Sequence, residues 1–198
     1  MVLKDEELVT RAQEGDQRAI EELLGRYQQK AYAIAYNMCS GDSEEAQDYT
    51  QEAFLRAFIN IKKFRKKSSF YTWFYRIVVN TCLDGIRRRR MRERIFSFWR
   101  WGAQKGDRPE FVLEEPPDVA ETSNPMTILS GKQLTRDVQK ALVSLPDKQR
   151  IAFQLKVLSG MSIREIADVM GSAEGTVKSH LFRATHFMRK TLKQWTIP

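Results

Sequence analysis

Apolar residues recur at steps of three and four along most of the chain, and this spacing is typical of one buried face of an α-helix. In the N-terminal half, the pattern predicts helices over residues 4–14, 17–39, 42–62 and 70–90. The alternation of apolar and polar residues that would indicate β-strands is almost absent. We therefore predict an all-α fold.

The third and fourth of these helices have recognisable starts. Ser43 and Ser69 are predicted to cap them, because a serine side chain at the N-cap accepts a hydrogen bond from a free backbone N–H. The apolar face of the third helix is predicted to comprise Ala46, Tyr49, Ala53, Phe54, Ala57, Phe58 and Ile61.

The C-terminal half resumes the helical pattern at Leu129, and its predicted helices cover about 129–145, 147–159, 162–170 and 174–193. Between the halves, prolines at 109, 116, 117 and 125 prevent one continuous helix, and an acidic run over 110–121 reads as a linker. We therefore expect two small helical domains, 1–92 and 129–198, joined by a flexible acidic linker over 93–128.

An aromatic patch interrupts this linker pattern. Its residues are Phe96, Phe98, Trp99 and Trp101. Such a patch is unusual in a linker, and we interpret it as a short amphipathic helix that docks on another surface.

Charge is distributed in blocks that change sign along the chain. Counting Lys and Arg against Asp and Glu, residues 1–61 carry −6, residues 62–105 carry +12, residues 106–128 carry −5 and residues 129–198 carry +7, for a net charge of +8. Basic blocks attract nucleic acid through long-range fields and counterion release. A solvated surface would carry the same charges, so the charge pattern alone leaves both interpretations open.

The chain has two cysteines, Cys39 and Cys82, and both fall in apolar helical patterns that predict a core position. Because there is no C-x-x-C and no Cys/His cluster, we expect no disulfide framework, no metal site and no cofactor. No segment reads as a signal peptide, and no apolar stretch approaches the roughly 18–20 residues that span a bilayer. We therefore expect a cytoplasmic protein.

The sharpest local signal lies in residues 161–183. Ser162 and Glu165 have the spacing of a capping box, and Gly171 stands where a tight turn needs a positive φ. Two short helices joined by such a turn form a helix-turn-helix, whose second helix enters the major groove of DNA. The alternative is an ordinary helical hairpin with a solvated cationic face. The residues predicted to face outward and to contact DNA are Thr176, Lys178, Ser179, Phe182 and Arg183.

A second signal lies in residues 62–90, where a basic loop, an aromatic cluster and an arginine run follow one another. Aromatic rings stack on unpaired bases while cations hold the backbone, so this composition suits single-stranded nucleic acid. We predict that Trp73, Phe74 and Phe54 belong to the core. The loop 65–71 and Asn80 are assigned to function, because an exposed asparagine on a basic helix can hydrogen-bond a base edge.

The third signal is the acidic and aromatic helix over 42–62. Asp48, Gln51 and Glu52 fall near the outward-facing Leu55 and Arg56. This mixture of charged and apolar residues is typical of a docking face for another protein. A solvated helix face would have the same composition, so the residues alone leave this alternative open.

Four motifs in order closely resemble the extracytoplasmic-function group of sigma factors. They are DYTQEAFLRAF at 48–58, FYTWFYRIVVNT at 70–81, LPDKQR at 145–150 and GTVKSHLFRA at 175–184. The likeness covers about residues 5–90 and 130–193. It implies a non-enzymatic subunit that directs RNA polymerase to promoters, with an N-terminal domain that melts and reads the −10 element and a C-terminal domain that binds the −35 element.

The resemblance also implies roles for particular residues. The polymerase-docking helix, which in the family grips the clamp coiled coil of the largest subunit, corresponds to Asp48, Gln51, Glu52, Phe54 and Arg56. Together with the basic segment, the resemblance assigns the −10 element to Arg65, Lys66, Lys67, Ser68, Ser69, Phe70, Tyr71, Arg76, Asn80, Arg87 and Arg88. The resemblance assigns the −35 element to the outward residues of 176–183. The acidic linker is expected to thread the polymerase channels.

The expected partners are RNA polymerase core, promoter DNA and an anti-sigma factor. In this family the anti-sigma factor is commonly membrane-anchored, and it would then hold the chain at the inner face of the membrane. The chain departs from the family pattern at His180, where many relatives have arginine, and in the aromatic patch 96–101, for which the pattern supplies no role.

Two rival functions are set against this one. A conventional helix-turn-helix repressor or activator would bind duplex DNA as a dimer without polymerase, but it leaves the first 90 residues unexplained. An enzyme acting on nucleic acid would need a metal-binding carboxylate cluster or an activated nucleophile, and no H-E-x-x-H, P-loop or G-x-S-x-G motif is present.

Overall fold

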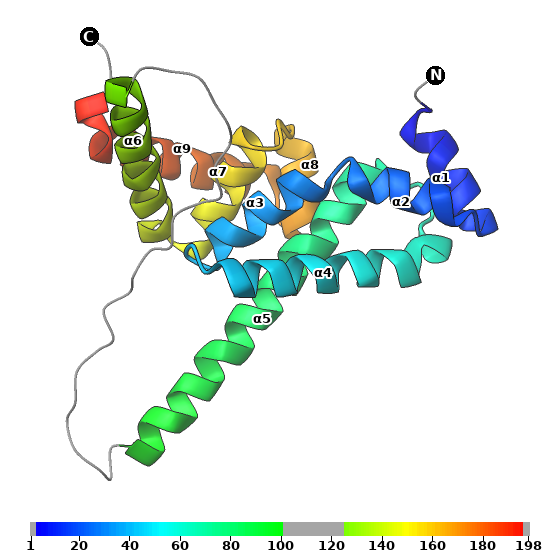
Figure 1. Cartoon of the computed structure of the whole chain (residues 1–198), viewed down its shortest axis with the longest axis horizontal. Coiled ribbons are helices and arrows are strands. Elements are labelled where there is room, and N and C mark those ends of the chain that lie inside the picture. Colours follow the sequence, from blue (N-terminus) through cyan, green and yellow to red (C-terminus); the bar gives the residue numbers. More distant parts are fainter. Residues whose placement is uncertain (1–2, 101–124, 196–198) are drawn as a thin grey trace.

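The computed structural model describes residues 3–100 and 125–195, with side chains described over 3–94 and 133–195. These residues form α-helices and contain no strand, which confirms the all-α prediction for them (Figure 1). The helices are α1 Asp5–Glu14, α2 Gln17–Gly25, α3 Gln28–Met38, α4 Ser43–Asn60, α5 Phe70–Arg100, α6 Pro125–Ser144, α7 Asp147–Val157, α8 Ile163–Met170 and α9 Glu174–Thr191, with 3-10 turns η1 Ile61–Lys63 and η2 Lys193–Trp195. None of the described helices is long and apolar enough to cross a membrane.

The N-terminal half is built around α3, α4 and α5, which pack against one another. Its centre is an aromatic cluster in which the fully buried ring of Phe74 lies 5.2 Å from Phe54 and 6.0 Å from Tyr27, centroid to centroid. Trp73 packs on the edge of the same cluster. The predicted core positions of Phe54, Trp73 and Phe74 are therefore confirmed.

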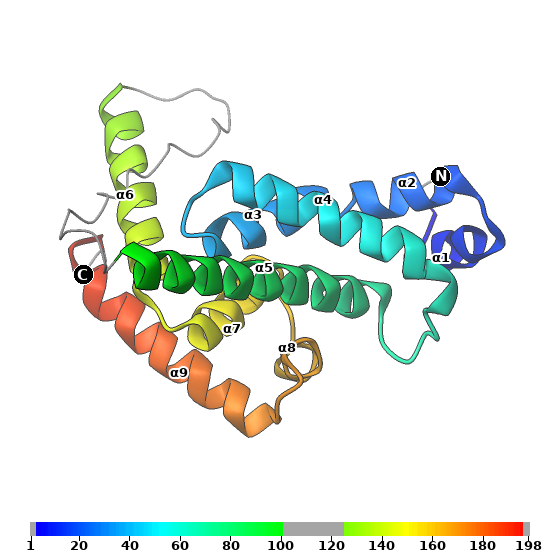
Figure 2. The ribbon, with the colours of Figure 1, turned by 90° about the horizontal axis from the view of Figure 1, so that it is seen from below.

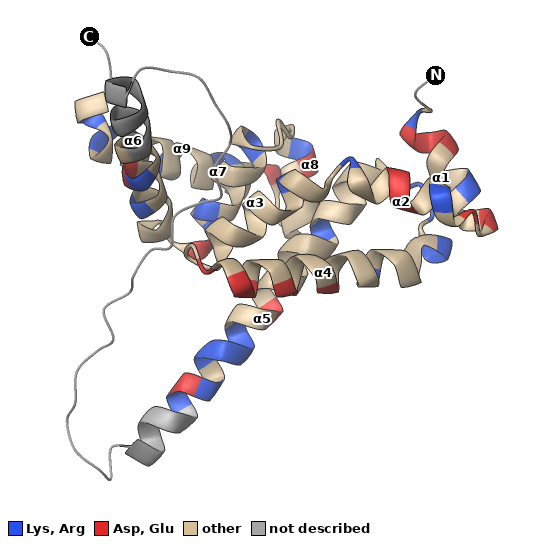
Figure 3. Ribbon diagram, viewed as in Figure 1, with Lys and Arg blue, Asp and Glu red and all other residues tan. Residues whose placement is uncertain are grey.

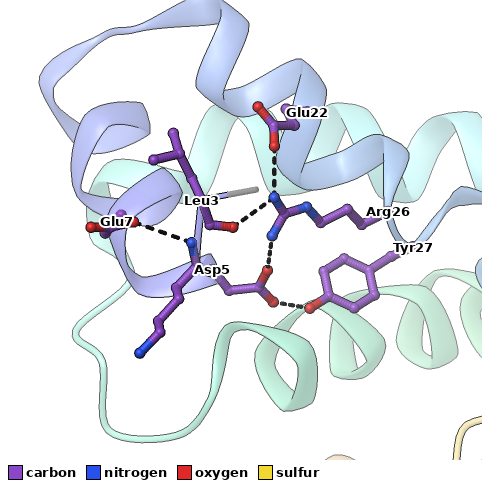
Figure 4. A network of polar contacts seen from close by, with 7 residues as sticks. Leu3, Asp5, Glu7, Glu22, Arg26 and Tyr27 are labelled. Carbon is purple, nitrogen blue, oxygen red and sulfur yellow. Dashed lines mark hydrogen bonds and ion pairs between the residues drawn. The ribbon is translucent and has the colours of Figure 1, made fainter. Parts of the chain in front are cut away.

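The single long helix predicted over 17–39 is wrong, because the chain breaks into α2 and α3 at Arg26 and Tyr27. α2 ends at Gly25, a poor helix former, and Figure 4 shows a polar network at the break that includes residues from the start of α1. Arg26 pairs with Asp5 at 2.7 Å and donates to the carbonyl of Leu3 at 2.7 Å, while the hydroxyl of Tyr27 donates to Asp5. Burial and this hydrogen bond to Asp5 raise the pKa of Tyr27. A pattern within residues 17–39 contains no trace of these distant partners.

Two local predictions also need correction. Asp42 caps α4, in place of Ser43, because its side chain accepts a hydrogen bond from the backbone N–H of Glu45 at 2.9 Å. The segment predicted as a linker over 93–128 is helical at both ends, since α5 continues to Arg100 and α6 begins at Pro125. Residues 87–94 consist of good helix formers without Gly or Pro, which explains the longer α5.

The aromatic patch lies almost entirely within the far end of α5, as residues 96–100 are helical. Its side chains, Trp101 and the acidic segment 101–124 lie outside the described residues. The predictions of a docking patch and of a flexible linker therefore remain predictions.

The C-terminal half contains the helix-turn-helix as the sequence indicates. Ser162 accepts a hydrogen bond from the N–H of Glu165 at 3.2 Å and donates its own N–H to the carboxylate of Glu165 at 2.9 Å, which completes the capping box. Gly171 follows α8 with φ +59°, a conformation that glycine adopts without the Cβ strain of other residues. The buried Val177 and the half-buried Leu181 face the interior, as predicted.

The two halves share a continuous core. The helix α8 packs against α5, and α7 packs against α3 (Figure 2). Leu155 and Ile166 belong to the same apolar cluster as Phe74 and Val78, while α6 and α9 form a second, smaller cluster around Leu142 and Met188. Cys39 and Cys82 are buried in the shared core, as predicted, and burial raises the pKa of Cys82 to about 12.

Candidate functional site

The outward face of α4 is acidic and accessible (Figure 3). Asp48 and Gln51 are exposed, whereas Glu52 is half-buried between two arginines. Its carboxylate pairs with Arg56 at 2.5 Å and with Arg88 of α5 at 3.3 Å. Because neither Asp48 nor Glu52 is enclosed in the core, this face is able to meet another molecule.

An exposed apolar stripe runs beside these carboxylates. Leu55, Phe58 and Ile59 are 59%, 45% and 61% exposed, and their spacing of three and four places them on one face of α4. The prediction that Phe58 belongs to the buried face of this helix is therefore wrong. Sequence reasoning found Leu55 and missed its two neighbours. The signal was present, because three large apolar residues at this spacing stand apart from the buried Ala53 and Ala57.

A pocket of 710 Å³ lies between α4 and α5, close to the pairs of Glu52. It is lined by Tyr49, Gly85, Arg87, Arg88, Met91 and Arg92. A Cβ at Gly85 would lie 2.2 Å from the ring of Tyr49. Glycine at this position of α5 is therefore needed for the Tyr49 side chain of α4 to pack against α5. The lining therefore combines apolar and aromatic side chains with three arginines.

The basic loop before α5 is held in place from α1. Gln13 donates to the carbonyl of Ile61 at 3.1 Å and to that of Phe64 at 2.7 Å, and Lys66 donates to the hydroxyl of Thr10 at 2.9 Å. Lys66 has φ +55°, a left-handed conformation that costs a non-glycine residue energy. Arg65, Lys66, Lys67 and Ser69 are exposed, and Ser68 is half-buried.

The start of α5 separates the residues assigned to the −10 element into two groups. Phe70 is buried in the aromatic cluster, and Ser69 caps the helix by accepting from the N–H of Thr72 at 3.1 Å. Tyr71 and Arg76 reach the C-terminal half of the chain, where they donate to the backbone carbonyls of Ser159 and Asp168.

Further along α5 the assigned residues are accessible. Asn80 is exposed one turn after Arg76. Arg87 and Arg88 are also exposed, although Arg87 lies 3.5 Å from Asp84 and Arg88 pairs with Glu52. Arg76 and Asn80 are one turn apart on α5, whereas Tyr71 points to the opposite side of the helix from Asn80, and the arginines follow Asn80 by about two turns.

The second helix of the helix-turn-helix presents its predicted residues to the outside. Thr176, Lys178, Ser179 and Arg183 are exposed, and Phe182 is 75% exposed. Ser179 donates its hydroxyl to the carbonyl of Gly175 at 3.0 Å, which leaves its oxygen able to accept a further bond. This large apolar ring is mostly uncovered by the described residues, and apolar contacts with thymine methyl groups are one use of such a ring.

His180 is half-buried on the inner edge of the same helix. Its Nδ1 atom is enclosed without a hydrogen-bond partner among the described residues. Burial lowers the pKa of His180, and the nearby Lys148 of α7 and Arg183 of α9 lower it further. His180 is therefore neutral near pH 7, unlike an arginine in that place.

The lowered pKa of His180 predicts a contribution to acid sensitivity. Because the folded state binds the proton more weakly than the unfolded chain, stability is lost as the pH falls below about 6.5, the ordinary histidine pKa. We expect His180→Gln to narrow the difference in Tm between pH 7.5 and pH 5.5. The exposed His186, five residues before the end of α9, supplies the control. If His186→Gln narrows this difference in Tm equally, the environment of His180 does not add to the acid sensitivity of the fold.

These features together define a class of protein: a helical DNA-binding protein with a helix-turn-helix in its C-terminal half and, in its N-terminal half, a cationic, aromatic helix beside an acidic helix with an exposed apolar stripe. Family models agree with both parts. Residues 23–92 match Sigma-70 region 2, and residues 135–185 match Sigma-70, region 4.

Curated relatives extend the likeness over nearly the whole chain. The ECF RNA polymerase sigma-E factor of Escherichia coli K12 is 37% identical over 192 residues, covering 92% of this chain and 91% of that protein. The RNA polymerase sigma-H factor of Pseudomonas aeruginosa PAO1 is 32% identical, covering 96% and 94%. The chain belongs to the extracytoplasmic-function group of the sigma-70 family, and it is accordingly a transcription initiation factor and not an enzyme.

Solved structures share the fold. The sigma factor RpoE in complex with the anti-sigma factor NepR from Bartonella quintana has a TM-score of 0.67 and 25% identity, covering 87% of this chain and 96% of that one. CnrH in complex with the cytosolic domain of CnrY also has a TM-score of 0.67, at 20% identity, and covers 97% and 99%.

Proposed function

We propose that three surfaces of this sigma factor divide the work of promoter recognition. The outward face of α4 docks on the clamp coiled coil of RNA polymerase. The loop 65–69 and the start of α5 read the melted −10 element, and the outward face of α9 reads the −35 element. The domains that carry these surfaces correspond to residues 1–92 and 129–198, with 93–128 as the connection.

The observation that carries the polymerase assignment is the exposed apolar stripe beside the carboxylates of α4. Large apolar side chains that are exposed side by side mark protein interaction sites more often than isolated ones do. Leu55, Phe58 and Ile59 offer the apolar centre of an interface, and Asp48 and Gln51 offer its polar rim. We add Phe58 and Ile59 to the docking residues on this ground.

The −10 assignment is supported by the chemistry of the loop and of α5. Exposed cations at 65–67 can hold a strand backbone, and Asn80 can hydrogen-bond a base edge. Taking a base out of the stack costs a few kcal/mol, so a surface that receives it stabilises the open strand. Phe70 supports this surface from the core, and we assign base stacking to the half-buried Tyr71.

Regulation by an anti-sigma factor is part of the proposal. The RpoE protein of Bartonella quintana, at 25% identity, is solved with such a partner. We propose that an anti-sigma factor, membrane-anchored as is common in the family, covers the α4 and α9 faces of this chain. The chain would then be cytoplasmic and held at the membrane until the partner releases it.

Transcription from a purified system tests the proposal. The chain is mixed with bacterial RNA polymerase core on genomic DNA of the encoding organism, and the 5′ ends of the transcripts are sequenced. We expect a set of start sites that share −10 and −35 elements and disappear when the chain is omitted. An absence of chain-dependent start sites on any genomic template would contradict the proposed function.

The variant Leu55→Asp isolates the docking face. Placing a charge in the centre of an interface removes a hot spot, which costs 2 kcal/mol or more, and we expect core binding to weaken about 30-fold. Glu14→Lys, a charge change at an exposed position of α1, is the control and should bind as the parent does. If Leu55→Asp binds core polymerase as tightly as Glu14→Lys does, α4 is not part of the polymerase interface.

A further inference from the structure

The first helix of the chain lies against the loop that we assign to the −10 element. We call residues 64–69, between η1 and α5, the −10 loop. Helix α1 contacts η1, which leads into this loop, and buries Leu8, Val9 and Ala12 in the core. The proposed contacts with DNA and polymerase use no residue of α1, so its role is to be found in what it does to its neighbours.

Gln13, in the last turn of α1, fixes the point where the −10 loop leaves the core. Its side-chain amide donates to the carbonyl of Ile61 at 3.1 Å and to that of Phe64 at 2.7 Å. An amide nitrogen has two N–H donors, so this one half-buried side chain is able to satisfy both carbonyls. Ile61 and Phe64 are themselves buried, and the N–H of Phe64 donates to Ile61 at 3.1 Å.

Thr10 lies one turn before Gln13 and holds the tip of the same loop. Lys66 has φ +55°, and its Nζ donates to the Thr10 hydroxyl at 2.9 Å. That hydroxyl donates in turn to the carbonyl of Glu6 at 2.9 Å, which orients its oxygen to accept the ammonium group. A strained backbone conformation persists only where its surroundings hold it, and such strain gathers at functional sites. The ammonium group of Lys66 is thus used within the chain.

The other end of α1 is anchored to the same core as the end of the −10 loop. Asp5, in the first turn of α1, pairs with Arg26 at 2.7 Å and accepts a hydrogen bond from Tyr27 (Figure 4). The ring of Tyr27 lies 5.8 Å from that of Phe70, where the −10 loop ends and α5 begins. Helix α1 is therefore fixed at its first turn and presents its second half to the loop as a rigid support.

We infer that Gln13 and Thr10 are positioning residues for the reading of the −10 element. Helix α1 holds the −10 loop in a strained conformation that keeps Arg65 and Lys67 at the surface, while Lys66 ties the loop to α1. The inference rests on the proposed function, and it assigns different roles to the three cations of the loop. Without the support of α1, the loop would keep its charges and lose its preference among bases.

Two variants of the full chain remove the support. Gln13→Met keeps a long, helix-forming side chain and loses both donors. Thr10→Val loses the hydroxyl that binds Lys66, and because Thr10 is exposed it leaves the core intact should Gln13→Met fail to fold.

The conformation of the loop is followed by limited digestion with trypsin, since Arg65, Lys66 and Lys67 are cleavage sites. Cleavage in a folded chain needs local opening of the segment. We expect cleavage after residues 65–67, identified by the masses of the fragments, to be roughly fivefold faster in Gln13→Met and about twofold faster in Thr10→Val.

The reading of bases is measured on holoenzyme assembled from each chain and RNA polymerase core. Each holoenzyme selects from forked DNA with a randomised single-stranded segment, and the bound DNA is sequenced. In Gln13→Met, the preference for the selected sequence over a single-base substitute should fall at least about threefold, while the affinity for core stays that of the parent.

The matched control is Gln17→Met, which removes the same amide from an exposed residue of α2 that hydrogen-bonds Glu21. It should retain the cleavage rate and the preference of the parent. A second check is additivity. Because Thr10→Val and Lys66→Met remove the same contact, the double variant should lose no more preference than the stronger single one.

The outcomes separate the inference from the proposed function. If Gln13→Met is cleaved faster but selects the parent's sequence with undiminished preference, α1 stabilises the loop without positioning it for bases, and the inference is wrong. Unchanged cleavage in both variants would contradict it as well. If the parent holoenzyme selects no sequence, the proposed function fails, and the cleavage rates alone decide whether α1 holds the loop.

Discussion

Replacing Phe74 by alanine is expected to lower Tm by roughly 10 °C, the largest loss of stability among the substitutions considered. The ring is fully buried and is surrounded by Tyr27, Phe54, Phe70 and Tyr75. Removing a buried phenylalanine costs about 3–5 kcal/mol, and 1 kcal/mol shifts Tm by about 2–4 °C in a chain of this size. Thermal unfolding followed by circular dichroism measures the change.

The same substitution at Phe182 is the control, because its side chain is largely exposed. Phe182→Ala should change the free energy of unfolding by no more than about 0.5 kcal/mol, while it weakens binding to promoter DNA. A loss of Tm at Phe182 as large as that at Phe74 would show that the aromatic cluster is not the centre of the fold.

Replacing Arg183 by alanine is expected to weaken binding to a promoter duplex by about 1–3 kcal/mol, which is roughly 5- to 150-fold in Kd. Arg183 is exposed on the third turn of α9, in line with Thr176 and beside Ser179. An arginine in the major groove can donate two hydrogen bonds to guanine, so the loss should be larger on the cognate −35 sequence than on a scrambled one. Fluorescence anisotropy with both duplexes at fixed salt measures the difference.

The control for Arg183 lies on the same helix. Arg189 is exposed in the last turn of α9, beyond the part that enters the groove of a helix-turn-helix complex. Arg189→Ala should leave the preference for the cognate duplex unchanged. Should Arg183→Ala weaken both duplexes equally and reduce the salt dependence, the side chain contacts phosphate and carries no sequence preference.

Local sequence signals predicted the helix-turn-helix almost completely. A capping box, a glycine with positive φ and a set of outward residues are all encoded within residues 161–183, so each is readable without knowledge of the rest of the chain. The exposure of Asp48, Gln51 and the five outward residues of α9 also followed from helical periodicity. The resemblance to the family rests on the same short motifs.

The errors arose where distant residues decide the outcome. At the break between α2 and α3, Arg26 and Tyr27 bind Asp5 of another helix, a contact that no pattern within 17–39 encodes. Phe58 fits the apolar period of α4 but remains 45% exposed, although its neighbours Ala57 and Ile61 are buried. Periodicity reports which residues share a face, and it does not report how far a neighbouring helix extends over that face.

By itself, the sequence determined most of the helices, the capping box of α8, the outward residues of α9 and the membership of a family, because these depend on contacts within one or two helical turns. The tertiary structure decided which apolar residues of α4 stay outside and that Tyr71 and Arg76 of α5 bind the backbone of Ser159 and Asp168. Such contacts join residues about 90 positions apart, and their free energy depends on the complementarity of two folded surfaces. No local pattern encodes that complementarity.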